Sequence, residues 1–507
     1  MKTLPFARRG RACSVLDRES FGGPSKLGPY EAVPSSSGRQ TAGTGRLTTA
    51  ATFVAVLFAF AAHASAADFK LLVKGGTMMT IKPGEETPFT GYMAIGTDGR
   101  IVAVGKGEPP ADHKAAAVVD ATGKFVIPGF ISAHSHVNQT AFRGLAVNEL
   151  LRGWGRIRNS QSSFATVEDQ YWFTLHGCLD HVRHGITSVY NFTGNVSAGA
   201  AQEEQLRGEA DSGIRFVHAW SRPRTLPEAE QRKLLTDFLK FAEPYRKSPF
   251  FLKMSLSGGA TTLAAVQLDA ALVKEYDLVN QTHFLEFPRD TEEQRAHFRY
   301  FIEARALGPS LYFGHFIHTD DAMLKAVGEA GGGMSWNPLS NGRLASGLAD
   351  IPKYERYGVK IGMGVDGQAS ADIPDPFENM RLGLYGIRAK YMSGTILKPI
   401  DVLRFHTLGS ATVMNVADKV GSLETGKFGD FLIIDPAAVD TAPVYDPYAT
   451  LVFACNTMNL EGVYIGGELV SSFCQLTKVD FAKIQDELHR RVNKIKAAQP
   501  VAAPTVL

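Results

Sequence analysis

Two histidines stand two positions apart at the end of an apolar run, where Ile127-Pro128-Gly129-Phe130-Ile131-Ser132-Ala133 leads into His134 and His136. On a β-strand, residues two apart point to the same face. Two neutral imidazoles on one rigid strand suit a divalent cation such as zinc. Such a pair is also common by chance, so its meaning depends on the other groups that the fold brings to it.

Three further groups end apolar runs of the same kind: His283, His315 and Asp366. Taken singly, a strand-end histidine is more often a hydrogen-bonded structural residue, and Asp-Gly is more often a turn. Their order along one strand-and-helix series changes this reading, because the carboxyl ends of parallel barrel strands meet at one mouth. The sequence therefore predicts that all five groups project into the same cavity.

The elements that must position these groups follow from the hydrophobic pattern. Residues 127–417 alternate apolar strand candidates with helical patterns, which predicts a TIM (β/α)8 barrel. Short β-runs broken by glycine occupy 68–126 and 418–476, and we expect them to form the two halves of one small β-sandwich. Residues 477–507 read as a C-terminal helix and tail. The strand candidates within and before the barrel are Phe125–Ile127, Thr187–Tyr190, Arg215–Ala219, Phe250–Met254, Gln281–Phe284, Leu311–His315 and Val359–Asp366.

The N-terminal part has the pattern of an export signal. Residues 1–46 form a Gly-, Ser- and Arg-rich disordered leader, and residues 47–67, which contain no charged side chain, form the hydrophobic region. Small residues at Ala62, Ala64 and Ala66 predict cleavage that leaves an N-terminus between Ser65 and Asp68. The alternative is a membrane anchor, although the strongly apolar part is short of the ~20 residues of a span. We expect a periplasmic or secreted protein without stable membrane association after cleavage.

The amino-acid composition limits the classes of partner and the types of metal ligand that can be expected. The 507 residues carry a formal charge of +2, which does not indicate a nucleic-acid or acidic-membrane partner, so a small-molecule substrate is expected. Four cysteines make no disulfide framework, and none form a Cys-x-x-Cys pair. Any metal must therefore rest on histidine and carboxylate ligands. Homo-oligomerisation is left open.

Several of these runs together resemble a known family. Residues 126–136 are similar to the metal-binding signature of the metal-dependent amidohydrolase superfamily. The runs Asn337–Asn341, Leu344–Gly347 and Gly364–Gly367 resemble its cytosine-deaminase and triazine-hydrolase branch, and Gly421–Phe431 resembles the strand-returning signature of that branch. The resemblance spans about residues 69–470.

The resemblance implies roles for individual residues. It makes His134, His136, His283 and Asp366 the ligands of a divalent metal, most simply one zinc ion, and places His315 beside the attacking water or the substrate carbonyl. Residues 283–286 match the family's His-x-x-Glu, which makes Glu286 the proton shuttle. These roles agree with the chemistry, since a carboxylate such as Asp366 can take a proton from an activated water and Glu286 can protonate a departing nitrogen. A solvated loop carboxylate is the alternative for Glu286.

The chain also departs from the branch. Deaminases of this branch carry a polar, His-containing segment after the fourth strand, where this chain has residues 255–259, and this departure disfavours a purine-type substrate. Residues 253–259 instead resemble the fourth-strand segment of dipeptidase-like amidohydrolases, whose lysine bridges two metals, so a second metal held by Lys253 and His315 is an alternative to a salt-bridged structural lysine. Trp336, Asn337 and Asn191 are candidate substrate contacts, with core packing the alternative for Trp336 and a turn role the alternative for Asn191.

The expected reaction is hydrolysis of a C–N bond. Amide, carbamate or urea substrates that are partly aromatic stand first, and deamination or dechlorination of a nitrogen heterocycle is the alternative. A non-catalytic ligand-binding barrel is the second alternative, and the presence of both Asp366 and Glu286 argues against it.

Overall fold

A computed structural model describes residues 68–193, 199–289 and 291–498. The predicted leader, the predicted signal region and the last nine residues of the tail, 499–507, lie outside the described residues. Among the helices of the described part, none is both long enough and apolar enough to span a membrane.

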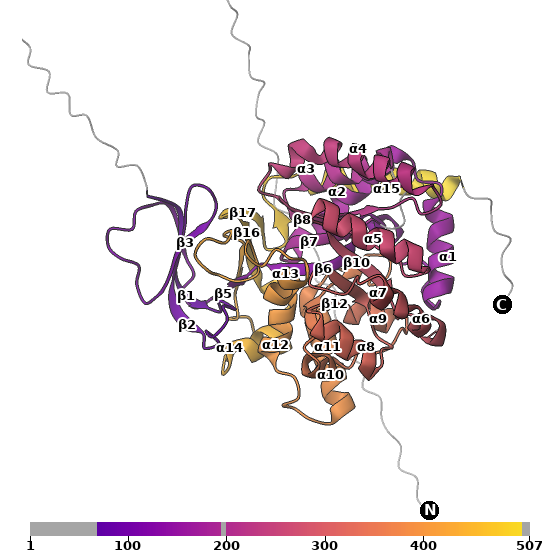
Figure 1. Ribbon diagram of the computed structural model, residues 1–507. Helices are drawn as coiled ribbons and strands as arrows, with labels where there is room; N and C mark the ends of the chain where they lie inside the picture. Colours follow the sequence, from indigo (N-terminus) through magenta and orange to yellow (C-terminus); the bar gives the residue numbers. More distant parts are fainter. Residues whose placement is uncertain (1–67, 194–198, 290, 499–507) are drawn as a thin grey trace, which may run out of the picture. The chain divides into compact units, whose positions relative to one another are not determined.

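The described residues build two nine-stranded sheets, and the strands of one of them are all parallel (Figure 1). Its strand order is β13-β12-β11-β10-β9-β8-β7-β6-β14. The two ends of this order, β13 and β14, follow each other along the chain, and β14 pairs with β6 while β13 pairs with β12. Together they act as one interrupted eighth strand that closes the barrel. The strands are β6 (Phe130–His136), β7 (Ile186–Phe192), β8 (Arg215–Ser221), β9 (Phe251–Ser257), β10 (Val279–Phe284), β11 (Leu311–His315), β12 (Gly333–Trp336), β13 (Lys360–Met363) and β14 (Asp366–Gly367).

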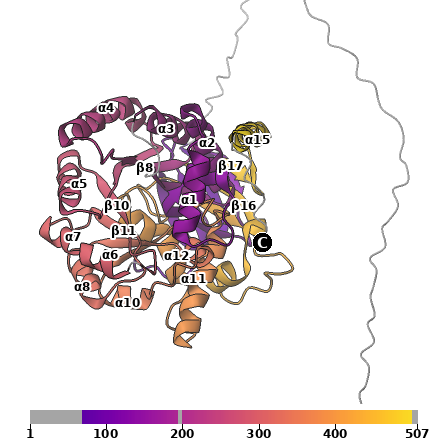
Figure 2. The ribbon, with the colours of Figure 1, turned by 90° about the vertical axis from the view of Figure 1, so that its right-hand side faces the viewer.

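Helices cover the outer face of these strands, as Figure 2 shows from the side of α1. Parallel strands that are buried on both faces read as nearly continuous apolar runs, which is why β7 and β8 are buried along their whole length. The predicted TIM-barrel fold is confirmed. The helices are α1 (Leu151–Ser162), α2 (Val167–Arg183), α3 (Ala200–Ser212), α4 (Glu228–Arg246), α5 (Leu263–Tyr276), α6 (Thr291–His297), α7 (Arg299–Glu303), α8 (Asp321–Glu329), α9 (Pro338–Arg343), α10 (Ile351–Arg356), α11 (Pro376–Tyr391), α12 (Pro399–Arg404), α13 (Ser410–Val413), α14 (Pro447–Ala449) and α15 (Phe481–Ala497).

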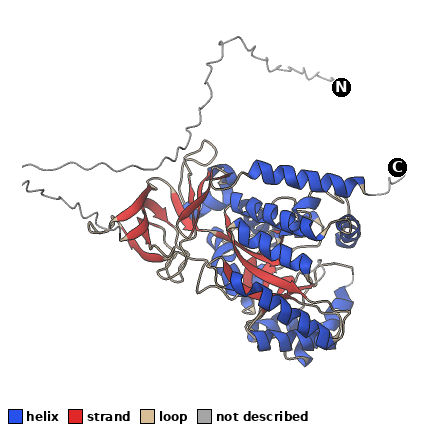
Figure 3. Ribbon diagram, turned by 90° about the horizontal axis from the view of Figure 1, so that it is seen from above, coloured by secondary structure: helices blue, strands red, loops and turns tan. Residues whose placement is uncertain are grey.

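The second sheet is mostly antiparallel and combines both ends of the described chain (Figure 3). Its strand order is β18-β17-β16-β15-β5-β1-β2-β3, and β4 pairs with β1. This confirms the predicted module of N- and C-terminal parts. Strand β5 lies in this sheet and β6 in the barrel, so the chain passes between them at Gly129. The strands are β1 (Phe69–Met78), β2 (Phe89–Ile95), β3 (Ile101–Lys106), β4 (Ala115–Asp120), β5 (Phe125–Pro128), β15 (Phe431–Ile434), β16 (Leu460–Ile465), β17 (Glu468–Ser472) and β18 (Gln475–Leu476).

A buried ion pair ties the two sheets together. The Arg215 guanidinium at the start of β8 donates from Nε and Nη2 to the two carboxylate oxygens of Asp430, at 2.6 and 3.0 Å. Its Nη1 donates to the carbonyl of Pro249, and the ring of Phe428 lies 3.6 Å from the guanidinium carbon. Each of the three nitrogens of this buried cation therefore donates a hydrogen bond, which fixes the position of the two sheets at this contact.

Candidate metal centre

Five side chains converge at the carboxyl-terminal mouth of the barrel, which is the functional end of such folds. His134 and His136 come from β6, His283 from β10, His315 from the end of β11 and Asp366 from β14. The sequence placed each of them at a strand end, and the structure brings all five together.

The ring nitrogens and carboxylate oxygens face one another at short distances. Asp366 Oδ1 lies 3.5 Å from His134 Nε2 and 3.6 Å from His136 Nε2, and the Nε2 atoms of His136 and His283 are 3.3 Å apart. Asp366 Oδ2 lies 3.9 Å from His315 Nε2. Oδ1 of Asp366 thus faces His134 and His136, whereas Oδ2 faces His315.

The far nitrogens of three imidazoles are held by specific acceptors. His134 Nδ1 lies 2.5 Å from Gln281 Oε1, and the amide nitrogen of Gln281 donates to the carbonyl of Ala133 at 2.9 Å, which orients the amide. His136 Nδ1 donates to the carbonyl of Phe192 at 2.8 Å. When Nδ1 donates a proton, Nε2 carries the lone pair, so these contacts aim the lone pairs of both rings at the centre.

His315 is held in the same way by an amide. Its Nδ1 lies 2.8 Å from Asn341 Oδ1 and 3.3 Å from the side-chain nitrogen of Asn337. Its Nε2 lies 3.5 Å from Glu286 Oε2. His315 therefore faces both Glu286 and Asp366.

The donor set fits a divalent metal. His134 Nε2 is buried and has no hydrogen-bond partner among the described residues. Possible ligand atoms within 4.8 Å of one another occur in three overlapping groups drawn from the five side chains and Glu286. Imidazole nitrogens with one carboxylate are a typical zinc donor set. His134, His136, His283 and Asp366 would hold the ion.

Burial sets the protonation of these groups. It lowers the pKa of His136 to about 3, assisted by His134, and it lowers the pKa of His283 well below its usual range. Burial alone would raise the pKa of Asp366, but the neighbouring rings of His134, His315 and His136 hold that pKa well below its usual range. His136 and His283 are thus held as neutral imidazoles and Asp366 as a carboxylate, which are the forms that bind a metal.

The pKa of Glu286 is shifted upward, in contrast to the lowered pKa of Asp366. Burial raises its pKa to about 7, and the Asp366 carboxylate adds to this shift while His315 opposes it. A carboxyl group with a pKa near the working pH can both accept and donate a proton. Glu286 thus has the properties of a proton-transfer group beside the metal ligands.

The backbone is strained where the site is built. Leu285, His315 and Asp366 have φ angles of 55°, 69° and 57°, a left-handed region that residues other than glycine rarely adopt. Gly364 meets a related demand, since a Cβ atom there would lie 2.6 Å from Asn337 Oδ1 and 2.8 Å from the backbone nitrogen of His134. These positions are consistent with a site whose geometry the surrounding fold imposes.

A cavity of about 280 Å³ opens onto these groups, and helix α1 supplies one wall through Trp154 and Arg158. His136, His283, His315, Glu286 and Asp366 line the opposite part. The indole nitrogen of Trp154 donates to the carbonyl of Ala369 at 2.8 Å, so this aromatic wall is fixed. The volume suits a small molecule.

The structure corrects the prediction for Lys253. Its ammonium group lies 3.1 Å from Asp277 Oδ2, and Asp277 precedes β10, so the pair sits at the amino-terminal end of the strands. Lys253 belongs to none of the three groups of possible metal ligands. The predicted second metal site of Lys253 and His315 is therefore not supported, because the two residues lie at opposite ends of the barrel.

The three candidate substrate contacts are all fully buried and serve structural roles. Trp336 packs toward α11, where its ring limits the space at Gly383, so its burial favours core packing, which was the alternative to a substrate contact. Asn337 accepts from the hydroxyl of Ser335 at 2.8 Å and supports His315. Asn191 donates to Glu209 at 2.5 Å and lines neither of the cavities beside the centre.

Sequence reasoning missed the residues that orient the ligands. Gln281, Asn341 and the carbonyl of Phe192 were not singled out, nor was Arg158. Gln281 offered one signal, since it lies two positions before His283 on the same predicted strand and thus on the same face. Phe192 acts through its backbone, which no side-chain motif marks.

Comparison with known proteins agrees with this geometry. A model of the amidohydrolase family matches residues 125–470. A 5-methylthioadenosine/S-adenosylhomocysteine deaminase of Syntrophobacter fumaroxidans is 28% identical over 84% of this chain and 98% of its own length. A 5'-deoxyadenosine deaminase of Methanosarcina barkeri is 25% identical over 84% of this chain and 98% of its own length.

Two solved structures are similar in fold. A zinc-bound adenosine deaminase from Xanthomonas campestris superposes with a TM-score of 0.75 at 22% identity and covers 85% of this chain and 99% of its own. An atrazine chlorohydrolase mutant from Arthrobacter aurescens, complexed with zinc and atraton, has a TM-score of 0.75 at 22% identity and covers 83% and 100%. At these identities the likeness shows the fold.

Proposed function

Because this chain belongs to the amidohydrolase family, a family of hydrolases that act on C–N bonds, we propose that it replaces an exocyclic amino group, or a comparable leaving group, on a nitrogen heterocycle by hydroxyl from water. The observation that carries the proposal is the position of Glu286. Its buried carboxyl lies 3.5 Å from His315 in the same cavity as the metal ligands. Displacement at a heterocyclic carbon requires a proton donor at that place, because the ring nitrogen must be protonated as the carbon is attacked.

The relatives support a heterocyclic substrate over a linear one. The two curated relatives described above are deaminases of adenosine-type molecules, and the two structures are an adenosine deaminase and a triazine chlorohydrolase. The sequence placed amides, carbamates and ureas first and ring deamination second. The comparisons favour the second of these.

The residues divide the proposed reaction among themselves. A divalent metal, for which zinc is our proposal, supplies water of lowered pKa when it is bound. Asp366 accepts a proton from the attacking water at Oδ2, the oxygen that faces His315. His315 orients the oxygen at the carbon under attack, and Glu286 protonates the ring nitrogen. The C–O bond forms, Asp366 passes its proton to the amino group, and the C–N bond breaks to release ammonia. The proton of the new hydroxyl then returns Glu286 to its acid form and leaves the ring-amide tautomer of the hydroxylated product.

The direct test is release of ammonia from matched substrates. Wild-type protein with measured metal content is assayed with adenosine, 5'-deoxyadenosine, an amino-triazine, an aryl amide and an aryl urea. We expect turnover of an amino-heterocycle, which chelator removes and zinc restores. Hydrolysis of the amide or urea without any ammonia from the heterocycles would contradict the proposal.

A ligand variant separates metal loss from misfolding. His136→Ala removes one imidazole from the centre, so metal content and turnover should fall together while the circular dichroism spectrum stays unchanged. His113→Ala, in the segment between β3 and β4 and outside the metal centre, is a matched control that should keep both. Full metal content in His136→Ala would remove His136 from the ligand set.

We also propose a periplasmic or secreted location, which the pattern of residues 47–67 supports. Expressed in a Gram-negative host, the protein should be recovered from the periplasm with an N-terminus between Ser65 and Asp68. A full-length chain found only in the cytoplasm would contradict this proposal, and uncleaved membrane association would favour an anchor.

A further inference from the structure

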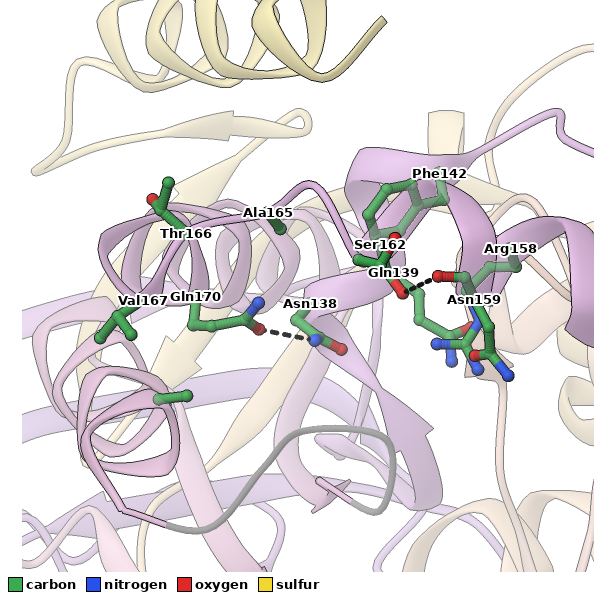
Figure 4. A pocket seen from close by; sticks show the side chains of 12 residues that line it. Asn138, Gln139, Phe142, Arg158, Asn159, Ser162, Ala165, Thr166, Val167 and Gln170 are labelled. Atoms are coloured by element: carbon green, nitrogen blue, oxygen red, sulfur yellow. Dashed lines mark hydrogen bonds between the residues drawn. The ribbon is translucent and has the colours of Figure 1, made fainter. Parts of the chain in front are cut away.

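A second cavity of about 480 Å³ adjoins the cavity that contains the candidate metal ligands. The two share Gln139, Arg158 and Asn159 as lining residues. Figure 4 shows Arg158 beside Gln139 and Asn159 at one end of this second cavity, with Asn138 and Gln170 further along. A molecule with one part at the metal ligands could therefore extend past Arg158 into the larger space.

Arg158 is a buried cation for which the described part of the chain supplies no hydrogen-bonding or ionic partner. The residue lies in helix α1, and it is only 5% exposed. Among the described residues it makes no hydrogen bond and no ion pair, and its Nε atom is buried with no partner. Within the described ranges, its direct attractive contact is the ring of Trp154, 5.4 Å from the guanidinium carbon. Burial lowers the pKa of Arg158 to about 10, and the charge of the Asp366 carboxylate, which forms no ion pair with it, opposes this shift.

Other buried arginines of this protein show what a structural role looks like. Arg215 binds both carboxylate oxygens of Asp430, and Arg222 donates to Asp269 and Gln231. Fully paired buried charges are the rule, because an unpaired one loses its hydration without compensation. Arg158 departs from this rule next to a cavity, as expected of a group whose partner is a ligand.

The surroundings of Arg158 favour an anionic partner. The twelve residues that the structure places around the larger cavity include no aspartate or glutamate, and their polar side chains are neutral apart from Arg158. The hydroxyls of Ser162 and Ser163 donate to carbonyls of their own helix. Arg158 is thus the charged group of this cavity, and its planar fork of donors matches a carboxylate or a phosphate.

We propose that Arg158 binds an anionic substituent of the substrate, a carboxylate or a phosphate, while the heterocycle lies against the metal ligands and Glu286. This inference rests on the proposed function, since it names the class of heterocycle that the same site accepts. It predicts that the substrate is an anionic amino-heterocycle whose charged group lies on the side of helix α1.

The first test measures anion binding without turnover. Metal-loaded wild type, Arg158→Gln and Arg156→Gln are titrated calorimetrically with benzoate, with inorganic phosphate and with neutral benzamide. Arg156 is an exposed arginine of the same helix, so its variant controls for the change in net charge. Anion binding to the metal is common to all three proteins and cancels in the comparison.

We expect at least one anion to bind about 10-fold or more weakly to Arg158→Gln than to the other two proteins, with benzamide unaffected. Preference for benzoate or for phosphate identifies the anionic group. Equal affinities within twofold in all three proteins, or no anion binding to wild type, would overturn the inference.

The second test uses matched substrates: adenosine, its 5'-carboxylate and its 5'-phosphate. Arg158→Gln should lower kcat/KM for an anionic member at least 10-fold more than for adenosine, mainly through KM. Equal losses for all three would overturn the inference. If wild type released ammonia neither from these three molecules nor from the amino-triazine, the proposed function would fail, and the anion titration would still decide the role of Arg158.

A stability measurement excludes a purely structural role. Because Arg158 is an unpaired buried charge, Arg158→Met should keep or raise the Tm while anion affinity is lost. A Tm lowered by several degrees in both Arg158 variants, with anion affinity unchanged, would assign the residue to folding instead.

Discussion

Replacing Glu286 by glutamine should abolish turnover and at the same time make the metal-free protein more stable. Glutamine keeps the size and hydrogen-bonding capacity of the side chain but cannot transfer a proton at neutral pH. A positioned proton donor contributes about 10²- to 10⁴-fold to a rate, so we expect a loss in kcat of at least about 10²-fold. Metal content should be unchanged, since Glu286 is not among the four proposed ligands.

The gain in stability follows from the raised pKa. Burial moves the pKa of Glu286 from 4.5 to about 7, which means that the folded protein binds a proton more tightly than the unfolded chain does. The contribution of Glu286 to the stability of wild type is therefore lost as the pH rises from about 4.5 through about 7. At pH 8 the cost is on the order of 3 kcal/mol, and Glu286→Gln removes it.

The assay is urea unfolding of chelator-treated wild type and variant at pH 5 and pH 8, together with steady-state kinetics of the metal-loaded proteins. The variant should be the more stable protein at pH 8, with a smaller difference at pH 5. Glu293→Gln, an exposed carboxyl on α6, is the control and should match wild type in both measurements. Wild-type turnover in Glu286→Gln would refute the proton-transfer role, and equal stability at pH 8 would refute the reasoning about burial.

Three further outcomes are expected. Gln281→Leu removes the acceptor that orients His134, so metal affinity measured by competition with a chelator should fall about 10- to 100-fold, and an unchanged affinity would contradict that role. Arg215→Ala leaves Asp430 buried without its partner, so the free energy of unfolding should fall by about 3–5 kcal/mol, and a loss below 1 kcal/mol would show that the ion pair is dispensable. Three buried histidines far from solvent have a pKa of about 4 because burial opposes their charged form: His176, His181 and His406. In the unfolded chain these histidines bind protons from about pH 6.5 downward, whereas in the folded protein they do so only near pH 4. Each of them therefore lowers the free energy of unfolding between pH 6.5 and pH 4, by on the order of 3 kcal/mol. Equal stability of the chelator-treated protein at pH 7 and pH 5 would argue against this pH dependence.

The local pattern of the sequence was sufficient for most of the barrel. The predicted strands at 187–190, 215–219, 281–284 and 311–315 lie within β7, β8, β10 and β11. They were recognisable because strands of a buried parallel sheet are continuous apolar runs. Strand β12 was not predicted, since four residues that include Gly333 carry too little pattern.

The candidate metal ligands could also be placed from the sequence, because their position at strand ends is a local property and the barrel itself gathers strand ends at one mouth. What each side chain touches is not local. Lys253 stands on a predicted strand like the ligands, yet it points to Asp277 at the other end of the barrel. A strand has two ends and two faces, and only the packing of its neighbours decides which of them a given residue meets.

The hydrogen bonds that orient the metal ligands and join the sheets depend even more on the tertiary structure. His134 depends on Gln281, 147 positions away in the chain, and the two sheets are joined by Arg215 and Asp430, 215 positions apart. The residues themselves are visible in the sequence, but their pairing exists only after the barrel has closed. The sequence by itself thus determined the fold class and which side chains gather at the mouth. The tertiary structure alone decided how these side chains are aimed, and it left Arg158 buried beside the second cavity with no partner among the described residues. The reason is that burial and long-range hydrogen bonds are properties of the folded chain.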